Sequence, residues 1–158
     1  GFMVGPDSEN DAAVRKMSRL FAAGAQAVVP WVAIFLRRAY GLGAMALTGG
    51  SFERPLYAAS WPSGEFGAMG LEGAVRLGFK KELEAESSEE ARAALFDKLL
   101  AAAYEQGKAI EAATYLEFDA VIEPAQTRKA IVLALASVVA WSCTGSTLSE
   151  SLVPELEI

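Results

Sequence analysis

Histidine is absent from the 158 residues of this chain, and cysteine occurs once, at Cys143. The chain therefore has no imidazole base, no internal disulfide and none of the Cys/His spacings that hold zinc. We expect no metal in this domain. A lone cysteine also fits a reducing compartment, so we expect a cytoplasmic location.

Long runs of positive charge and of apolar residues are missing as well. Lys and Arg number 14 against 20 Asp and Glu, a net charge of −6, and no basic run could follow a phosphate backbone. We therefore expect no nucleic-acid partner. The longest apolar run, 130–143, is shorter than the roughly 20 residues that span a bilayer, so we expect no membrane segment. The chain opens on Gly1-Phe2-Met3-Val4 without an initiator Met or a signal peptide, and we expect it to be cut from a longer protein.

A composition of 53% hydrophobic and 22% charged residues is typical of one globular domain with a real core. The capping-box spacing that starts at Ser8 predicts an amphipathic helix ending near Ala27, with one apolar face: Val14, Met17, Phe21 and Ala25. The run 28–36 is apolar throughout, which predicts a strand covered on both faces, with Pro30 at its start. This succession favours an α/β fold.

The rest of the chain alternates in the same way. We expect a strand over 56–60 and a helix that begins near Leu71 and has Gly78 just past its end. An exposed charged connection over 79–90 should follow, and then a helix that Ser87 and Glu90 cap and Gly107 ends. A further turn should lead to Val121-Ile122, and a final helix should begin at Pro124 and bury Ala130, Ile131, Leu133 and Leu135. Residues 145–158 read as a loose polar tail.

Glycine is concentrated where the first strand ends. Gly41 and Gly43 follow the strand, and the small-residue helix after them can extend only to Gly49-Gly50. The first amides of a helix have no intrahelical acceptor and lie at the positive end of its dipole, so bare backbone there can bind an anion. We predict that the chemistry lies at Gly43 and Ala44. The segment also matches the dinucleotide fingerprint G-x-G-x-x-A, but the helix is too short and no acidic residue closes a second strand. A third interpretation is that the glycines only allow a tight turn and close packing.

Several side chains near this turn have two open interpretations. Arg37 and Arg38 could meet a carboxylate ligand or form a solvated pair. Glu65 could be a site carboxylate or a turn acceptor. The aromatic residues are expected in the core rather than on a stacking platform, because no basic residues are interleaved with them: Trp31, Trp61, Trp141, Phe35 and Phe66.

Two longer strings carry a family resemblance. Leu36-Arg37-Arg38-Ala39-Tyr40-Gly41-Leu42-Gly43-Ala44 and the stretch from Trp61-Pro62-Ser63-Gly64-Glu65 to Val75 resemble, in order and spacing, the C-terminal half of biotin-dependent acyl-CoA carboxyltransferases. Gly1-Phe2 is similar to the end of that family's Asp-x-Pro-Gly-Phe turn, and 121–128 to its closing Val-Ile-Asp-Pro-x-x-Thr-Arg. We take 1–136 as the carboxyltransferase C-terminal domain and 137–158 as a tail of unclear role. The chain departs from the family at Glu123, where Asp is usual, and in the extra residue of its Tyr-Gly-Leu-Gly-Ala turn.

The resemblance implies a crotonase-like fold and the transfer of a carboxyl group from carboxybiotin, held on a carrier protein, to the α-carbon of an acyl-CoA. It implies that Gly43 and Ala44 donate backbone N–H groups to biotin. Substrate-binding residues would be Arg37, Tyr40, Ala46 and Glu65, with Ala46 helping to set acyl length. Loss of one such donor costs about 10²- to 10³-fold in comparable sites.

The resemblance also implies partners: an N-terminal carboxyltransferase half, biotin carboxylase, the biotin carrier protein and further copies in a homo-oligomer. The fragment alone would be inactive. Two alternatives stay open, a biotin-dependent acyl-CoA decarboxylase subunit and a non-catalytic assembly domain. A crotonase-fold hydratase or isomerase would need an acid/base pair, for which only Glu65 and Glu72 are placed.

Overall fold

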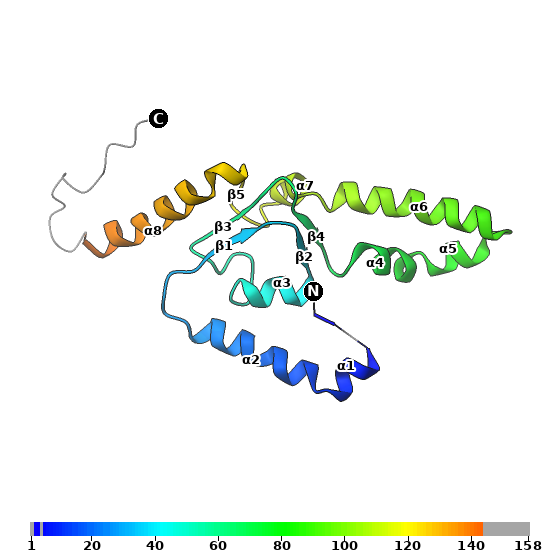
Figure 1. The fold of residues 1–158 in the computed structure, drawn as a ribbon, viewed down its shortest axis with the longest axis horizontal. Helices are drawn as coiled ribbons and strands as arrows, with labels where there is room; N and C mark the ends of the chain where they lie inside the picture. The colour runs from blue at the N-terminus through cyan, green and yellow to red at the C-terminus, as the bar shows by residue number, and fades with distance from the viewer. Residues whose placement is uncertain (1, 4, 144–158) are drawn as a thin grey trace.

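A computed structural model describes residues 2–3 and 5–143 of the chain. Along the chain the elements are α1 (Pro6–Asn10), α2 (Ala13–Gln26), β1 (Val32–Phe35), β2 (Arg38–Tyr40), α3 (Gly41–Leu47), β3 (Tyr57–Ser60), β4 (Glu65–Gly67), α4 (Leu71–Gly78), α5 (Lys80–Ala85), α6 (Glu89–Gln106), α7 (Ala109–Thr114), β5 (Ala120–Val121), the 3₁₀ turn η1 (Pro124–Gln126) and α8 (Thr127–Cys143). Figure 1 shows the strands at the centre and the longer helices around them.

Two small sheets hold the centre together, and every strand pair in them is parallel. One sheet has the order β1-β3-β5 and the other pairs β2 with β4. Parallel neighbours need crossover connections, and helices provide most of them here. The expected α/β class is therefore confirmed.

The two sheets share an aromatic core. Phe35 of β1 and Phe66 of β4 are buried, and their ring centroids lie 5.1 Å apart. Phe118 stacks on Phe66 at 4.9 Å, and Phe52 meets Phe35 edge-on at 5.0 Å. Such edge and offset contacts stabilise a core beyond the area they bury. The prediction that Phe35 and Phe66 belong to the core is confirmed.

Two of the three tryptophans lie at the edge of this core. Trp31 and Trp61 are half-buried, and the Trp61 indole N–H donates to the Thr127 hydroxyl at 2.9 Å. This bond joins the turn after β3 to the first residue of α8. Trp141 and the tail 145–158 lie outside the residues whose side chains the structure describes.

The first two predicted elements need correction. Ala12 has a left-handed φ of 56° and breaks the expected helix into α1 and α2, so Ser8 lies inside α1 and caps nothing. Strand β1 covers only four residues, and Val28 and Val29 are 98% and 64% exposed. The apolar run was not enough to predict a strand buried on both faces. Its first residues lie in the connection from α2, and within β1 only Phe35 is buried.

Strands β2 and β4 and helix α7 were not predicted, and the charged connection 79–90 contains helix α5, with Leu83 buried. Helix α6 ends at Gly107 as expected. Its cap, however, is Ser88, whose hydroxyl accepts the Ala91 N–H at 3.1 Å, and not Ser87.

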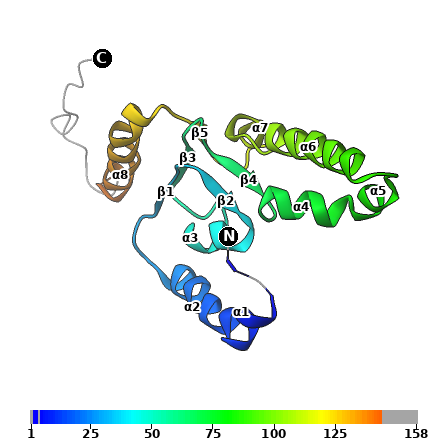
Figure 2. The ribbon, with the colours of Figure 1, turned by 45° about the vertical axis from the view of Figure 1, so that its right-hand side comes forward.

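Helices α4, α5 and α6 pack on one another and form an arm that extends from the centre (Figures 1 and 2). Helix α4 packs against α6, with Val75 only 2% exposed, and the Arg76 guanidinium lies 4.4 Å from the Phe96 ring centroid. Helix α8 extends from the opposite side of the strands.

Helix α8 differs from its prediction in what it buries. Ala130 and Ile131 are half-buried as expected, but Leu133 and Leu135 are 48% and 41% exposed. The helix continues across residue 136, so the division into 1–136 and 137–158 stays a prediction. Among the described residues, no helix is long and apolar enough to cross a bilayer.

Candidate functional site

The site predicted from the glycines is built where β2 passes directly into α3. Tyr40 ends the strand and is the N-cap of the helix, and Gly41 takes a φ of +53°. A Cβ at Gly41 would collide with the Ala68 carbonyl oxygen, so both its backbone angle and its surroundings require glycine. The helix therefore begins at Gly41, two residues before Gly43.

The start of α3 at Gly41 determines which backbone N–H groups have no hydrogen-bond acceptor within the helix. Gly41, Leu42 and Gly43 are its first three residues, and their N–H groups have no intrahelical acceptor. In the part of the chain that the structure describes, no other backbone carbonyl accepts the Gly43 N–H. Ala44 is the fourth residue, where a regular helix uses the N–H for its first bond to the N-cap carbonyl, here that of Tyr40.

A groove of about 450 Å³ opens at this first turn. Its walls come from α2, β2, α3 and the turn before α4, and they include Met17, Arg38, Gly43, Met69 and Glu72. The groove thus combines apolar walls with backbone donors and a few charged side chains at its sides, a composition typical of sites for small ligands.

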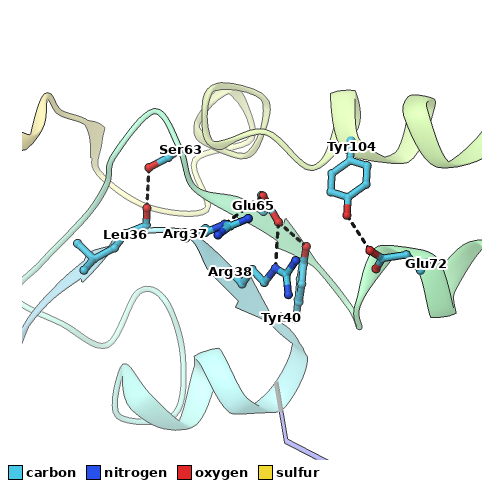
Figure 3. A network of polar contacts seen from close by, with 8 residues as sticks. All are labelled: Leu36, Arg37, Arg38, Tyr40, Ser63, Glu65, Glu72 and Tyr104. Carbon is cyan, nitrogen blue, oxygen red and sulfur yellow. Dashed lines mark hydrogen bonds and ion pairs between the residues drawn. The ribbon is translucent and has the colours of Figure 1, made fainter.

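The second helix at the groove begins with Gly70, the N-cap of α4. A Cβ built on Gly70 would meet nothing within 4 Å, so the backbone there is open. Glu72 in the first turn of α4 accepts a hydrogen bond from the Tyr104 hydroxyl at 2.9 Å (Figure 3). Its own backbone N–H, followed by this hydroxyl, lowers the pKa of the Glu72 carboxyl.

A carboxylate and a tyrosine lie beside the start of α3 (Figure 3). The Tyr40 hydroxyl donates to Glu65 Oε2 at 2.9 Å, and Tyr40 is 7% exposed. The Nε atoms of Arg37 and Arg38 lie 3.8 and 3.6 Å from the two oxygens of Glu65. Burial, and then the bond to Glu65, raises the pKa of the Tyr40 hydroxyl well above its ordinary value. Tyr40 is therefore neutral and a donor at physiological pH.

The predicted site residues thus fall into three places. Gly43 lines the groove, together with Tyr40. Glu65 and Arg37 lie in the ion-pair network behind Tyr40. Ala44 packs with the aromatic core, and Ala46 is 0% exposed, so its side chain has no accessible surface in this chain.

Several groove residues were missed from the sequence. Arg38 rather than Arg37 lines the groove, because Arg38 and Tyr40 lie two apart on β2 and so share a face. Recognition of β2 as a strand would have shown this. Met17 and Met69 come from distant elements, and nothing local in the sequence marks them.

Among residues 2–3 and 5–143, no group of three or more His, Cys, Asp and Glu side chains could hold a metal ion. The chemistry that these residues can offer is hydrogen-bond donation from the main chain at a helix start, beside a groove. Donors of this kind stabilise negative charge that develops on an oxygen.

Fold and site together define an α/β protein with the crotonase-like fold and a groove at the start of a short helix. Solved structures with this fold superpose well. One is described as a single-chain, multi-domain long-chain acyl-CoA carboxylase, with a TM-score of 0.73 and 51% identity over 85% of this chain and 13% of that one. Another is a transcarboxylase 12S hexamer with methylmalonyl-CoA bound, with a TM-score of 0.76 and 26% identity over 100% of this chain and 29% of that one.

The chain belongs to the carboxyl transferase domain family, whose model matches residues 1–144. It is 33% identical over 135 residues to the methylmalonyl-CoA carboxyltransferase 12S subunit of Propionibacterium freudenreichii subsp. shermanii, covering 85% of this chain and 25% of that one. It is 32% identical over 137 residues to the methylmalonyl-CoA decarboxylase subunit alpha of Veillonella parvula, and the match covers 86% of this chain and 25% of that subunit. The chain spans about a quarter of the length of these curated relatives.

Proposed function

We propose that this chain is the C-terminal part of a biotin-dependent acyl-CoA carboxyltransferase and supplies the donors on the biotin side of its active site. The reaction moves a carboxyl group from carboxybiotin to the α-carbon of an acyl-CoA. The observation that carries the proposal is the place of Gly43, which lines the groove and whose N–H has no intrahelical acceptor.

The residues at the groove suit a biotin ring. When bound, carboxybiotin would supply the carboxyl group and, once that group has left, a ring nitrogen that can act as the base, so no side-chain base is needed. Met17 and Met69 provide soft apolar walls for an uncharged ring. The Gly43 N–H would stabilise the negative charge that develops on the ureido oxygen more than it stabilises the ground state. For Ala44 to be the proposed second donor, its N–H would have to be shared with, or released from, the bond to the Tyr40 carbonyl that a regular helix makes at this position.

We assign different roles to the residues of the predicted substrate site. We place Tyr40 in the groove wall and Arg37 with Glu65 behind it, where they shape the site. Ala46 is buried in the second turn of α3, and we propose that it affects acyl length through the packing of this helix.

The partners belong to the same proposal. The N-terminal half would bring the second oxyanion hole, for the thioester enolate, and most of the CoA site. Biotin carboxylase and the biotin carrier protein would deliver carboxybiotin, and copies of the subunit would form a homo-oligomer in the cytoplasm. The exposed leucines of α8 and the hexamer described for the transcarboxylase 12S structure support an assembly.

A crystal soaked with free biotin tests the donors directly. We expect the ureido oxygen about 3 Å from the Gly43 nitrogen and from that of Ala44. An oxygen within reach of Gly43 and Leu42 would shift the pair by one residue. Biotin bound elsewhere, with no contact to the first turn of α3, would contradict the proposal.

A second candidate is a biotin-dependent acyl-CoA decarboxylase subunit, which runs the transfer in reverse. The similarity to the Veillonella decarboxylase subunit alpha favours it almost as strongly. A membrane-embedded pump subunit encoded beside this chain would support the decarboxylase, and net carboxylation of an acyl-CoA by the assembled enzyme would support the carboxylase.

A further inference from the structure

Tyr40 links the polar network to the helix start that carries Gly43. It is the last residue of β2 and the N-cap of α3, and no side chain of the described residues caps this helix. Its ring is buried, and a Cβ on Gly67 would lie 3.7 Å from its Cδ1 atom, so the ring packs against β4. The direction of the first turn of α3 therefore depends on how Tyr40 is held.

Glu65 is held from three sides. Its N–H donates to the Arg37 carbonyl at 2.7 Å, and its backbone forms an antiparallel bridge with Lys108. The next residue, Phe66, donates its N–H to the Gly107 carbonyl at 2.7 Å. The Glu65 carboxylate thus projects from a point that β2, β4 and the connection between α6 and α7 all fix.

The carboxylate meets β2 with one oxygen and Arg37, the residue just before this strand, with the other. Oε2 accepts the Tyr40 hydroxyl at 2.9 Å and lies 3.6 Å from Arg38 Nε, and Oε1 lies 3.8 Å from Arg37 Nε. Its hydrogen-bonding capacity is therefore directed to the strand that leads into α3, and the two guanidinium groups balance its charge.

We propose that Glu65 is a positioning residue. Through its hydrogen bond to Tyr40 it fixes the first turn of α3, so that the Gly43 N–H faces the groove at the angle that the reaction needs. This inference rests on the proposed function and replaces a direct role of Glu65 in substrate binding. Displacement of a reacting group by about 1 Å can cost on the order of 10²-fold in rate, so a bond of this kind would matter without touching the substrate.

The test compares two tyrosines in the assembled carboxyltransferase. Tyr40→Phe and Tyr104→Phe each delete one tyrosine–carboxylate bond of 2.9 Å, but only Tyr40 leads into α3. We expect kcat of Tyr40→Phe to fall by about 10- to 100-fold with an unchanged KM for acyl-CoA, and kcat of Tyr104→Phe to stay within about twofold. Rates are referred to the amount of folded, assembled enzyme.

Glu65→Gln completes the test, because its amide oxygen still accepts from Tyr40 while the ion pairs are lost. We expect a smaller fall in kcat than for Tyr40→Phe, because the bond that positions the first turn of α3 is retained. An unchanged kcat of Tyr40→Phe, or an equal fall for Tyr104→Phe, would overturn the positioning role.

Biotin-bound structures separate this inference from the proposed function. If biotin in the unsubstituted enzyme does not contact Gly43, the proposed function fails. If it contacts Gly43 equally closely in the unsubstituted enzyme and in Tyr40→Phe, only the positioning role of Glu65 fails. A longer distance from Gly43 in Tyr40→Phe supports both.

Discussion

At the residue scale, Tyr40 is the group whose protonation should be visible in the stability of the fold. Burial and the Glu65 bond raise the pKa of its hydroxyl in the folded state. Below about pH 10, the ordinary value, Tyr40 is protonated in both states and its contribution is complete. Above that pH the unfolded chain releases the proton first, so the free energy of unfolding falls as pH rises.

We therefore expect the free energy of unfolding to fall less steeply between pH 10 and 12 in Tyr40→Phe than in the unsubstituted chain. Urea denaturation at a series of pH values measures it. Tyr57 and Tyr104 also have raised pKa values and contribute to the slope of both proteins, so the comparison isolates Tyr40. Parallel profiles for the two proteins would show that Tyr40 is not held as described.

A second residue-scale prediction concerns the cap of α6. The Ser88 hydroxyl accepts the Ala91 N–H, whereas the exposed Ser87 lies before the cap. Ser88→Ala should cost about 1 kcal/mol of the free energy of unfolding, and Ser87→Ala less than about 0.5 kcal/mol. Urea denaturation measures the free energy of unfolding of both variants. A larger loss for Ser87→Ala than for Ser88→Ala would show that Ser87 is the cap, as expected from the sequence.

The residues of the site were predictable to the extent that their signals are local. Gly41 and Gly43 stood out because backbone without side chains is rare in a short helix. Glu65 stood out beside Gly64, but its partners did not, because Tyr40 lies 25 residues away along the chain. The hydrogen bond between Tyr104 and Glu72, which are 32 residues apart, likewise cannot be predicted from the sequence alone.

At the scale of elements, α2 approaches the end of α3 so closely that only glycine fits. A Cβ on Gly24 would lie 2.7 Å from the Gly49 Cα atom, and Arg54 Nη2 donates to the Ala27 carbonyl at 3.0 Å, at the end of α2. This contact holds α2, and with it Met17, against the groove.

We expect Gly24→Ala to lower the free energy of unfolding by about 1–3 kcal/mol, more than the gain in helix propensity of up to about 1 kcal/mol. The matched control is Gly78→Ala at the end of α4, where a Cβ would meet nothing within 4 Å. We expect this variant to be at least as stable as the unsubstituted chain. Thermal unfolding of both is sufficient, and a stabilised Gly24→Ala would mean that α2 is packed more loosely than described.

Element prediction succeeded where the chain marks both ends of an element. Helix α6 has a serine at its start and Gly107 after its end, and it was expected within one residue. Strands β2 and β4 have three residues each and pair with each other, and β4 has one further bridge, from Glu65 to Lys108. Because a strand this short is stabilised by its partner rather than by its own pattern, it leaves little trace in a single sequence.

At the scale of the whole molecule, helix α8 presents apolar surface that the described residues of this chain leave exposed. Val132 is 52% exposed and Leu133 48%, and a groove of about 440 Å³ lies where α8 passes Leu56 and Tyr57. Helix–groove surfaces of this kind are commonly buried in larger assemblies. The relatives, about four times longer, have chain enough to cover it.

The last prediction concerns the division of the active site. This chain offers donors at the start of α3, but a carboxyl transfer also needs stabilisation of the thioester enolate, which the proposed N-terminal half would supply. We expect the chain alone to show no transfer from carboxybiotin to acyl-CoA, and addition of the N-terminal half to restore it together with a rise in molecular mass measured by light scattering. Carrier protein with biotin removed provides the control, and it should give no transfer in the complete mixture. Full activity of the 158 residues by themselves would mean that both sets of donors lie within them and that the halves have been assigned wrongly.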